Sequence, residues 1–352
     1  MKKKVLVVDD SALLRKHLKR ILEGAGFEVE LARDGQECLN KLPLFNPDAL
    51  TLDVNMPIMD GMTCLSRIMS TKPKPVVMVS SLTEKGAVAT FEALELGAVD
   101  YVPKPSMSMS ESAELVIKTV SAACNTHVSG GISLKNKLRL RKEVSESVNK
   151  PQIQRTFTSQ TNKIDLVLIG VSTGGPACLQ AILQTIPANF PAPIVVAQHM
   201  PARFTDVFAK RLNSTSPLHV QEVVNATNLQ PGHVYIAKGD ADVKIAKRAA
   251  QLVVSSEPAS SEYVWHPSIN KLVSTATQAV NPRKLLCVQL TGMGNDGAEA
   301  MKIAHSKGAT TIAESEETAV VYGMPKELVN CGGATKVLPN YKIANAIMDA
   351  VS

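Results

Sequence analysis

A serine flanked by glycines follows a hydrophobic run in the second half of the chain. Residues 170–174 read Gly-Val-Ser-Thr-Gly and place Ser172 in the pattern G-x-S-x-G. This pattern is typical of a sharp turn from strand to helix that exposes the serine hydroxyl. Amides at the start of the next helix can stabilise negative charge beside it. From the residues alone, a nucleophilic serine and a glycine-rich phosphate-binding turn both stay open, although the Lys-Ser/Thr ending of a nucleotide P-loop is absent.

A nucleophilic serine needs a base and a carboxylate that orients the base. His199 follows the apolar run 194–197, and Asp296 follows the run 285–290. If these runs are parallel strands beside the strand of the serine, the three side chains lie at one sheet edge. The order Ser, His, Asp differs from that of α/β-hydrolases. The alternatives are that His199 caps a strand end and that Asp296 braces a glycine turn. His266 is a rival base, which we assign to the substrate pocket.

A group of carboxylates near the amino terminus indicates a second kind of chemistry. Asp9 and Asp10 follow the apolar run 5–8, and Asp53 follows the run 49–52. Like charges at one edge of a sheet repel one another unless a cation neutralises them, and oxygen ligands of this kind suit Mg²⁺. A solvated loop end is the simpler interpretation for any single aspartate, but it explains the whole set poorly.

The elements that must position these residues alternate between strand and helix. The predicted strands are 5–8, 49–52, 76–79, 164–171, 194–197 and 285–290, and the predicted helices are 11–23 and 87–96. Such alternation predicts α/β folds with doubly wound parallel sheets, whose sites lie at the carboxyl ends of the strands. Four short runs separated by turns are predicted as antiparallel additions to the second sheet, at 220–224, 234–237, 243–246 and 252–255.

The length of 352 residues predicts two domains. We place them at 1–123 and 163–352, joined by a basic polar linker at 124–162, in which 132–148 could form a transient helix. Residues 124–163 hold eight basic and two acidic residues, which equals the net charge of +6 and leaves 30 of each sign elsewhere. The basicity therefore belongs to the linker, a candidate docking segment, and we expect no nucleic-acid partner.

The six cysteines lie far apart and form no C-x-x-C motif, so we expect reduced thiols rather than a zinc site. Two aspartates interrupt the first apolar run too early for a signal peptide. No apolar stretch approaches the roughly 18 residues that span a bilayer. These features predict a soluble cytoplasmic protein that does not insert into a membrane.

Four motifs in the first third of the chain belong together. They are Val-Val-Asp-Asp-Ser at 7–11, Leu-Asp-Val-Asn-Met-Pro-Ile-Met-Asp-Gly at 52–61, Val-Ser-Ser at 79–81 and Tyr-Val-Pro-Lys-Pro at 101–105. Over residues 3–122 the chain resembles the flavodoxin-like receiver domain of bacterial response regulators. The resemblance implies that Asp53 accepts a phosphoryl group from a histidine kinase. It further implies that Asp10, Asp53 and the main-chain carbonyl of Asn55 hold Mg²⁺, with Asp9 acting through water.

Three further receiver residues follow from the same resemblance. Lys104 is implied to pair with the phosphoryl group, and the Ser80 hydroxyl to move toward it. Tyr101 is implied to reorient on phosphorylation, although a tyrosine that simply fills a gap is an equal alternative. The chemistry is consistent, because phosphoryl transfer depends on positioning and charge neutralisation more than on covalent help from the protein.

The motifs of the second half carry another resemblance, through residues 169–176, 198–212, 290–298 and 320–325. Over residues 163–349 they resemble the catalytic domain of the chemotaxis protein-glutamate methylesterases, the CheB family. By this resemblance Ser172 is the nucleophile, His199 the base, Asp296 its orienting carboxylate, and the Met293 amide part of the oxyanion hole.

The family implies a substrate and a mode of regulation. The substrate would be a γ-glutamyl methyl ester on a chemoreceptor, with methanol as product, and some receptor glutamines would be deamidated by the same route. The esterase step would need no cofactor. A chemotaxis histidine kinase would supply the phosphoryl group, and the unphosphorylated receiver would cover the active site. The competing hypothesis is a catalytically silent module that docks on receptors or kinase. A DNA-binding regulator lacks support, because no helix-turn-helix segment follows the receiver.

The chain departs from the usual family pattern at the rim of the pocket. Lys238 stands where proline is usual, and Asn270 where aspartate is usual. Residues 313–316 read Ala-Glu-Ser-Glu in place of Ala-Gln-Asp-Glu, which introduces Glu314 and Ser315. We expect these departures to affect the choice of receptor and glutamyl site rather than the chemistry.

Overall fold

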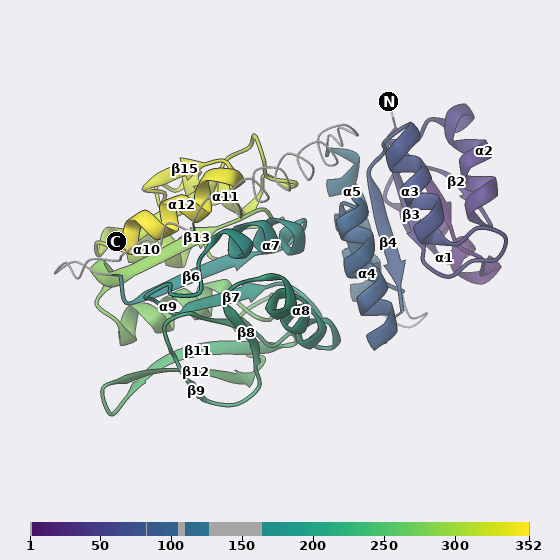
Figure 1. The fold of residues 1–352 in the computed structure, drawn as a ribbon. Helices are drawn as coiled ribbons and strands as arrows, with labels where there is room; N and C mark the ends of the chain where they lie inside the picture. Colours follow the sequence, from purple (N-terminus) through teal and green to yellow (C-terminus); the bar gives the residue numbers. More distant parts are fainter. Residues whose placement is uncertain (1, 82, 105–109, 127–163, 352) are drawn as a thin grey trace. The chain divides into compact units, whose positions relative to one another are not determined.

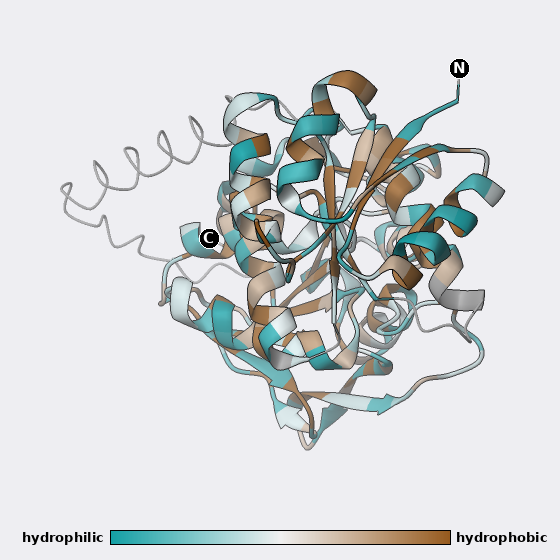
Figure 2. Cartoon of the chain, turned by 90° about the vertical axis from the view of Figure 1, so that its right-hand side faces the viewer, coloured by the Kyte–Doolittle hydropathy of each residue, from teal (hydrophilic) through white to brown (hydrophobic). Residues whose placement is uncertain are grey.

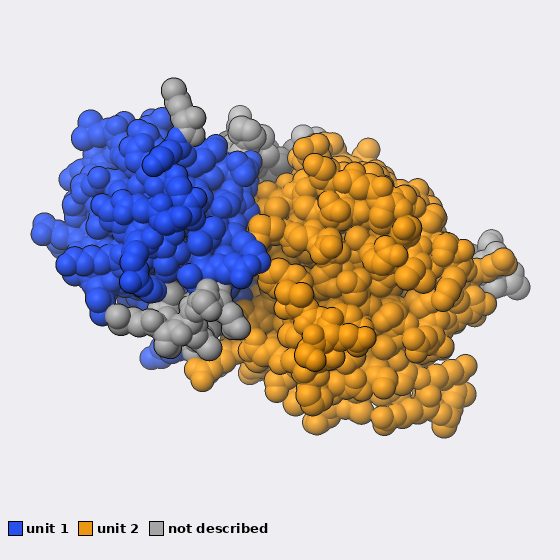
Figure 3. Space-filling view, turned by 180° about the vertical axis from the view of Figure 1, so that it is seen from behind, with its two compact units in different colours: residues 1–156 blue, residues 157–352 orange. Residues whose placement is uncertain are grey.

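The computed structural model divides the chain into two compact units, Met1–Thr156 and Phe157–Ser352 (Figure 3). It describes residues 2–81, 83–104, 110–126 and 164–351. Most of the predicted linker, including the segment 132–148 with its expected transient helicity, lies outside the described residues.

The first unit is built on a five-stranded parallel sheet (Figure 1). Its strands are β1 (Lys4–Val8), β2 (Glu28–Ala32), β3 (Ala49–Asp53), β4 (Val76–Ser80) and β5 (Asp100–Pro103). Its helices are α1 (Ala12–Gly24), α2 (Gly35–Phe45), α3 (Gly61–Thr71), α4 (Glu84–Leu96) and α5 (Ser110–Cys124). The strand order β2-β1-β3-β4-β5 is the flavodoxin-like order, which opens a crevice between the carboxyl ends of β1 and β3. The predicted doubly wound receiver fold is confirmed.

The strands of this unit differ in how clearly the sequence marks them. β3 and β4 are buried along their whole length and read as continuous apolar runs, as strands covered on both faces do. The edge strand β2 reads Glu-Val-Glu-Leu-Ala and is only partly buried, so it has no continuous apolar run and was not predicted. Helix α1 begins at Ala12 rather than at the predicted Ser11, because the Ser11 hydroxyl caps the helix by accepting the Leu14 amide at 3.3 Å.

The second unit is built on a seven-stranded sheet whose members all run parallel. In spatial order they are β15 (Lys336–Leu338), β14 (Thr310–Glu314), β13 (Leu285–Gln289), β6 (Leu166–Val171), β7 (Ile194–Gln198), β10 (His233–Ala237) and β8 (His219–Val223). The helices are α7 (Gly175–Thr185), α8 (Ala202–Thr215), α9 (Ile269–Ala279), α10 (Ala298–Ser306), α11 (Met324–Asn330) and α12 (Asn340–Val351). In Figure 2 the hydrophobic colour runs along many of the interior strands, whereas the helices carry both hydrophobic and hydrophilic colours.

The topology of this sheet determines where a site can form. The chain enters at β6, builds outward through β7, and later returns to add β13 on the opposite side of β6. A reversal of this kind opens a crevice at the carboxyl ends of the central strands, where ligands bind in open α/β sheets. Residues that directly follow β6, β7 and β13 therefore meet at one place.

The prediction of antiparallel additions was wrong for the first two of the four short runs. β8 and β10 pair with each other in parallel, and β10 also pairs in parallel with β7. The connection from β8 to β10 makes an excursion through β9 (Thr227–Asn228), which belongs to another sheet, so the chain returns in its original direction. Two short apolar runs separated by a turn look like a hairpin in a sequence. They pair in parallel instead when the connection between them crosses over, as the connection from β8 to β10 does.

The other two short runs are antiparallel, as predicted, but they lie in a separate sheet. Strands β11 (Ala241–Arg248) and β12 (Gln251–Pro258) form a hairpin, and β9 adds to β12 as a third strand. Helix α9 packs against β11 of this small sheet and also contacts β6 of the seven-stranded sheet, so it lies between the two sheets of the second unit.

The turn of this hairpin gives a prediction for stability. Ala249 and Ala250 have φ angles of +45° and +73°, in the left-handed region where asparagine and glycine are favoured in two-residue hairpin turns. A left-handed alanine costs roughly 1–2 kcal/mol. We expect the double substitution Ala249→Asn/Ala250→Gly to raise the free energy of unfolding by about 1–2 kcal/mol in urea denaturation. Ala259→Gly, at an exposed position without positive φ, is the control. The prediction is contradicted if the free energy of unfolding rises no more in the double variant than in this control.

Candidate active site

The three predicted residues of the second unit lie within hydrogen-bonding distance of one another. Ser172 directly follows β6, His199 follows β7, and Asp296 lies in the loop between β13 and α10. The Nδ1 atom of His199 is 3.2 Å from Ser172 Oγ, and its Nε2 atom is 2.9 Å from Asp296 Oδ2. These strands are adjacent in the order β13-β6-β7 (Figure 1), so the sheet brings together residues that are up to 124 positions apart in the chain.

The two partners of His199 determine the positions of its proton and its lone pair. A carboxylate only accepts hydrogen bonds, so Nε2 carries the proton that faces Asp296. In the neutral ring the lone pair then lies on Nδ1 and faces the Ser172 hydroxyl. The indole of Trp265 stacks on the imidazole at 5.1 Å between centroids, and the planes differ by 11°. The histidine side chain is only 7% exposed, so its position is well restrained.

Asp296 lies at the amino terminus of helix α9. Its Oδ2 atom accepts the Ile269 amide at 2.7 Å, and its Oδ1 atom accepts the Asn270 amide at 3.0 Å. The Ser268 hydroxyl lies 3.4 Å from Oδ1. Amides and the helix dipole at such a terminus favour a negative charge. These hydrogen bonds fix the carboxylate with its Oδ2 atom facing His199.

The loop after β13 packs closely against Ser172. A Cβ atom on Gly292 would lie 2.7 Å from Ser172 Cβ and 2.4 Å from Met324 Sδ, so only glycine fits there. The Ser172 amide donates to the Thr291 carbonyl at 2.9 Å, which fixes the main chain of the serine. The Met293 amide, which follows this glycine, donates no hydrogen bond among the residues that the structure describes.

The three predicted carboxylates of the first unit also cluster at one edge of its sheet. Asp9 and Asp53 are buried and Asp10 is exposed, and one carboxylate oxygen of each lies within 4.8 Å of the others. Lys104 Nζ lies 2.8 Å from Asp53 Oδ2 and 3.5 Å from Asp9 Oδ2. Burial raises the pKa of Asp9, and its Oδ2 atom is buried without a hydrogen-bond partner among the described residues.

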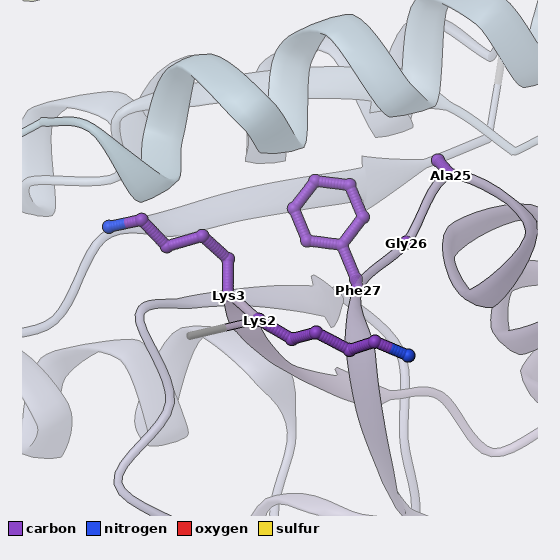
Figure 4. Close-up of a pocket in the computed structure, with 5 residues that line it drawn as sticks. All are labelled: Lys2, Lys3, Ala25, Gly26 and Phe27. Carbon is purple, nitrogen blue, oxygen red and sulfur yellow. The ribbon is translucent and has the colours of Figure 1, made fainter.

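The other predicted receiver residues are placed as follows. The Ser80 hydroxyl donates to the Gly86 carbonyl at 3.1 Å, so it must change its rotamer to reach Asp53. Tyr101 is half-buried on β5, and Asn55 is exposed in the loop after β3. A pocket at the opposite, amino end of β1 is lined by Lys2, Lys3, Ala25, Gly26 and Phe27 (Figure 4) and holds none of the predicted residues.

Comparison with known proteins places both units in families. The family model "CheB methylesterase" matches residues 167–347, and "Response regulator receiver domain" matches residues 5–116. A protein of Rhodospirillum rubrum named protein-glutamate methylesterase/protein-glutamine glutaminase 3 is 51% identical over 98% of this chain and 95% of its own length. The chain belongs to the CheB methylesterase family. A Carboxydothermus hydrogenoformans relative of the same type is 44% identical over 99% of both chains.

A solved structure extends this assignment to the fold of the second unit. The catalytic domain of the CheB methylesterase of Thermotoga maritima aligns with a TM-score of 0.52 and 40% identity. The alignment covers 53% of this chain and 98% of that domain. The predicted membership of the CheB family and the predicted α/β architecture are both confirmed.

The rival histidine belongs to a separate group of charges. His266 Nδ1 lies 2.8 Å from Asp242 Oδ1, and Lys271 Nζ lies 3.2 Å from Asp242 Oδ2. Burial opposes the ionisation of Asp242, but the hydrogen bonds from His266, Ser260 and Lys271 lower its pKa overall. His266 therefore has its own carboxylate and no hydrogen bond to Ser172 in the part of the chain described. Trp265 was not predicted as a site residue, although it is the only tryptophan in a chain poor in aromatic residues.

Two of the departures from the CheB pattern have a structural setting. The Asn270 side chain accepts the Ala300 amide at 3.3 Å, so it tethers α10 without adding a second negative charge beside Asp296. Glu314 is fully buried at the end of β14. It accepts hydrogen bonds from the Thr291 amide at 2.8 Å and from the Thr318 hydroxyl at 2.9 Å.

The buried Glu314 gives a prediction for the pH dependence of stability. Burial raises the pKa of Glu314, and the hydrogen bonds from Thr291 and Thr318 offset this only in part. A carboxyl whose pKa is raised by folding contributes its full stability below its unfolded pKa and loses it as the pH rises through its folded pKa. Glu314→Gln should therefore gain stability over the wild type with rising pH, by about 1.4 kcal/mol per unit of pKa difference.

Urea denaturation at pH 5, 6.5 and 8 measures this gain. Exposed Glu262→Gln is the control and should show a difference from wild type that does not change with pH. A constant difference for Glu314→Gln as well would show that the buried carboxyl does not titrate in this range.

Proposed function

We propose that this protein hydrolyses γ-glutamyl methyl esters of chemoreceptors, with release of methanol, and deamidates receptor glutamines. The observation that carries the proposal is the continuous hydrogen-bonded set of Ser172, His199 and Asp296 in a member of the CheB family. The names of the full-length relatives agree with both reactions.

The geometry supports a double-displacement mechanism. Ser172 Oγ attacks the ester carbonyl while Nδ1 of His199 takes its proton, and Asp296 stabilises the resulting imidazolium. The Met293 amide donates a hydrogen bond to the developing oxyanion. The methoxide leaves with the proton from His199. Water then hydrolyses the acyl-enzyme with His199 again as base, which restores the serine and yields glutamate. An amide substrate would follow the same path and release ammonia, and neither route uses a cofactor.

Release of methanol from methylated chemoreceptor membranes tests this function, with ammonia release as the readout for deamidation. The wild-type protein should release methanol, and more of it in the presence of acetyl phosphate and Mg²⁺. Membranes that were never methylated are the control. If the protein binds the membranes but releases no methanol in any condition, the silent docking module is the correct reading instead.

For the first unit we propose phosphorylation of Asp53 by a chemotaxis histidine kinase. The residues fit a magnesium ion, because hard oxygens cluster there and the buried Asp9 Oδ2 has no hydrogen-bond partner among the described residues. Asp10, Asp53 and the Asn55 carbonyl would hold the ion, with Asp9 acting through water. When bound, it neutralises the carboxylate and phosphoryl oxygens. Lys104, whose ammonium is 2.8 Å from Asp53 Oδ2, pairs with the phosphoryl group. Ser80 and Tyr101 change rotamer when Asp53 is phosphorylated.

The proposed domain order connects the two activities. A receiver at 1–123, a basic linker at 124–162 and a catalytic domain at 163–352 form one chain, in which the unphosphorylated receiver inhibits the active site. We propose that the protein works in the cytoplasm, on the cytoplasmic helices of receptors, with no nucleic-acid partner. None of the helices that the structure describes is long and apolar enough to cross a membrane.

Removal of the phosphorylation site gives a prediction about regulation. Asp53→Ala should abolish the stimulation of methanol release by acetyl phosphate and leave the basal rate within about twofold, since Asp53 lies outside the catalytic unit. The ratio of rates with and without acetyl phosphate is the measurement. Asp48→Ala, at a half-buried position just before β3 of the same unit, should keep the stimulation. If the Asp53 variant is still stimulated, phosphorylation occurs elsewhere.

A further inference from the structure

Two strands that flank the strand of the serine each end in a buried glutamine. Gln198 is the last residue of β7 and Gln289 the last of β13, and their side chains are almost fully buried. In the sheet register Gln198 pairs with Val171 and Gln289 with Gly170, on either side of β6. All other residues of β7 and β13 are apolar, so these two amides break the apolar pattern at strand ends that lie one residue apart in the register.

The two amides donate to the main chains of the three triad residues. Nε2 of Gln198 donates to the Ser172 carbonyl at 3.1 Å and to the His199 carbonyl at 3.0 Å. Nε2 of Gln289 lies 3.3 Å from the Asp296 carbonyl and donates to it. One glutamine thus joins the nucleophile to the base, and the other tethers the carboxylate loop to the sheet.

The orientation of both amides follows from these partners. Carbonyl oxygens only accept hydrogen bonds, so the nitrogen of each amide must face them. The Oε1 atom of each glutamine is buried and has no partner among the described residues, which is destabilising. An apolar side chain of similar shape would avoid this, so packing alone does not account for the two glutamines.

Glycines make room for the two amide oxygens. A Cβ atom on Gly175 would lie 2.2 Å from Gln198 Oε1, and one on Gly297 would lie 2.6 Å from Gln289 Oε1. Both glycines begin the segments that follow the triad loops, so the backbone at these points is shaped to accommodate the glutamines.

We propose that Gln198 and Gln289 are positioning residues that together hold the main chains of Ser172, His199 and Asp296 in catalytic register. The proposal rests on the proposed hydrolase function and adds to it the part that aligns the triad. Three loops from three strands must meet with hydrogen-bond precision, and a displacement of about 1 Å can cost roughly 10²-fold in rate. Ties between the loop main chains and the rigid strand ends oppose such a displacement.

Gln198→Met and Gln289→Met test the proposal, because methionine keeps the length of the side chain and removes its donor. We expect kcat for methanol release to fall about 10- to 100-fold, with KM within twofold of wild type, because the alignment and not the binding surface is lost. Labelling of Ser172 by a fluorophosphonate should slow by a similar factor. Gln198→Glu, which points an oxygen at two carbonyl oxygens, should be slower than Gln198→Met.

Thr311→Val is the matched control. The Thr311 hydroxyl donates to the Gly333 carbonyl at 2.5 Å in β14 of the same sheet, so its loss also removes a buried hydrogen bond, but away from the triad. We expect a lower melting temperature with kcat and labelling unchanged. The two glutamine variants are read separately at a temperature where circular dichroism shows them folded. A fall in kcat in either variant supports the proposal. We expect the smaller fall for Gln289→Met, because this variant loses a single hydrogen bond, which is longer than the two bonds of Gln198.

A purely structural role predicts a different result. If a folded methionine variant lowers the melting temperature as Thr311→Val does but keeps kcat and the labelling rate within twofold, the proposal is overturned. If the wild type releases no methanol yet is labelled at Ser172, the substrate assignment fails, and the labelling rates still decide the positioning role. If the wild type is not labelled either, both proposals fail together.

Discussion

Replacement of Ser172 by alanine is expected to lower kcat for methanol release by roughly 10⁶-fold, the largest effect of any single change. The hydroxyl is the group that would form the acyl-enzyme, and alanine leaves no atom to attack the ester. The fold should survive, because the serine makes its main structural contact through its main-chain amide, which donates to the Thr291 carbonyl. Single-turnover release of methanol from labelled receptor membranes is the measurement, with the melting temperature measured alongside.

Ser274→Ala provides the control for this substitution. Ser274 is half-buried on α9 and its hydroxyl donates to the Lys271 carbonyl, so the same atoms are removed outside the site. Its activity should stay within twofold of wild type. If Ser172→Ala keeps more than about one hundredth of the wild-type rate, another residue is the nucleophile.

Replacement of Asp296 by asparagine is expected to lower kcat by about 10⁴-fold. The substitution removes the negative charge that stabilises the His199 imidazolium. An amide nitrogen that faced Nε2 would also keep the ring proton on Nδ1, where it points at Ser172 and prevents proton abstraction. In addition, the NH2 group of the new side chain must face the main-chain amide of either Ile269 or Asn270. Both of these amides donate hydrogen bonds to the carboxylate in the wild type, so two donors would oppose each other. Steady-state kinetics should show the loss in kcat rather than in KM.

The second histidine-carboxylate pair offers a matched comparison. Asp242→Asn removes a negative charge beside His266. The distance from ring nitrogen to carboxylate oxygen is 2.8 Å in this pair and 2.9 Å in the pair of His199 and Asp296. We expect a loss of less than tenfold, seen mainly in KM, because this pair belongs to the pocket and not to the reacting atoms. If Asp242→Asn causes the larger loss in kcat, His266 is the base and the assignment of His199 is wrong.

Local pattern was sufficient for much of the fold. Continuous apolar runs such as that of β3 identify buried parallel strands, and Ser11 marks the start of α1 through its side-chain cap. It failed for several strands toward the outer parts of the sheets, among them the internal strand β14, which was not predicted. The edge strand β2 was missed because it is only partly buried and carries charged residues. β8 and β10 were assigned the wrong direction because strand direction depends on the connection between them, which the sequence pattern does not show.

The sequence by itself determined which residues were candidates and the strand ends to which each belongs. Gly-x-Ser-x-Gly, His199 after β7 and Asp296 after β13 could be placed at one sheet edge, because parallel strands present their carboxyl ends together. Only the tertiary structure decided which histidine faces the serine, since His199 and His266 both have a carboxylate partner. It also showed that α9 donates its terminal amides to Asp296 and that two glutamines donate hydrogen bonds to the main chains of the triad loops. These are contacts between residues far apart in sequence, and they exist only once the strands have been ordered in the sheet.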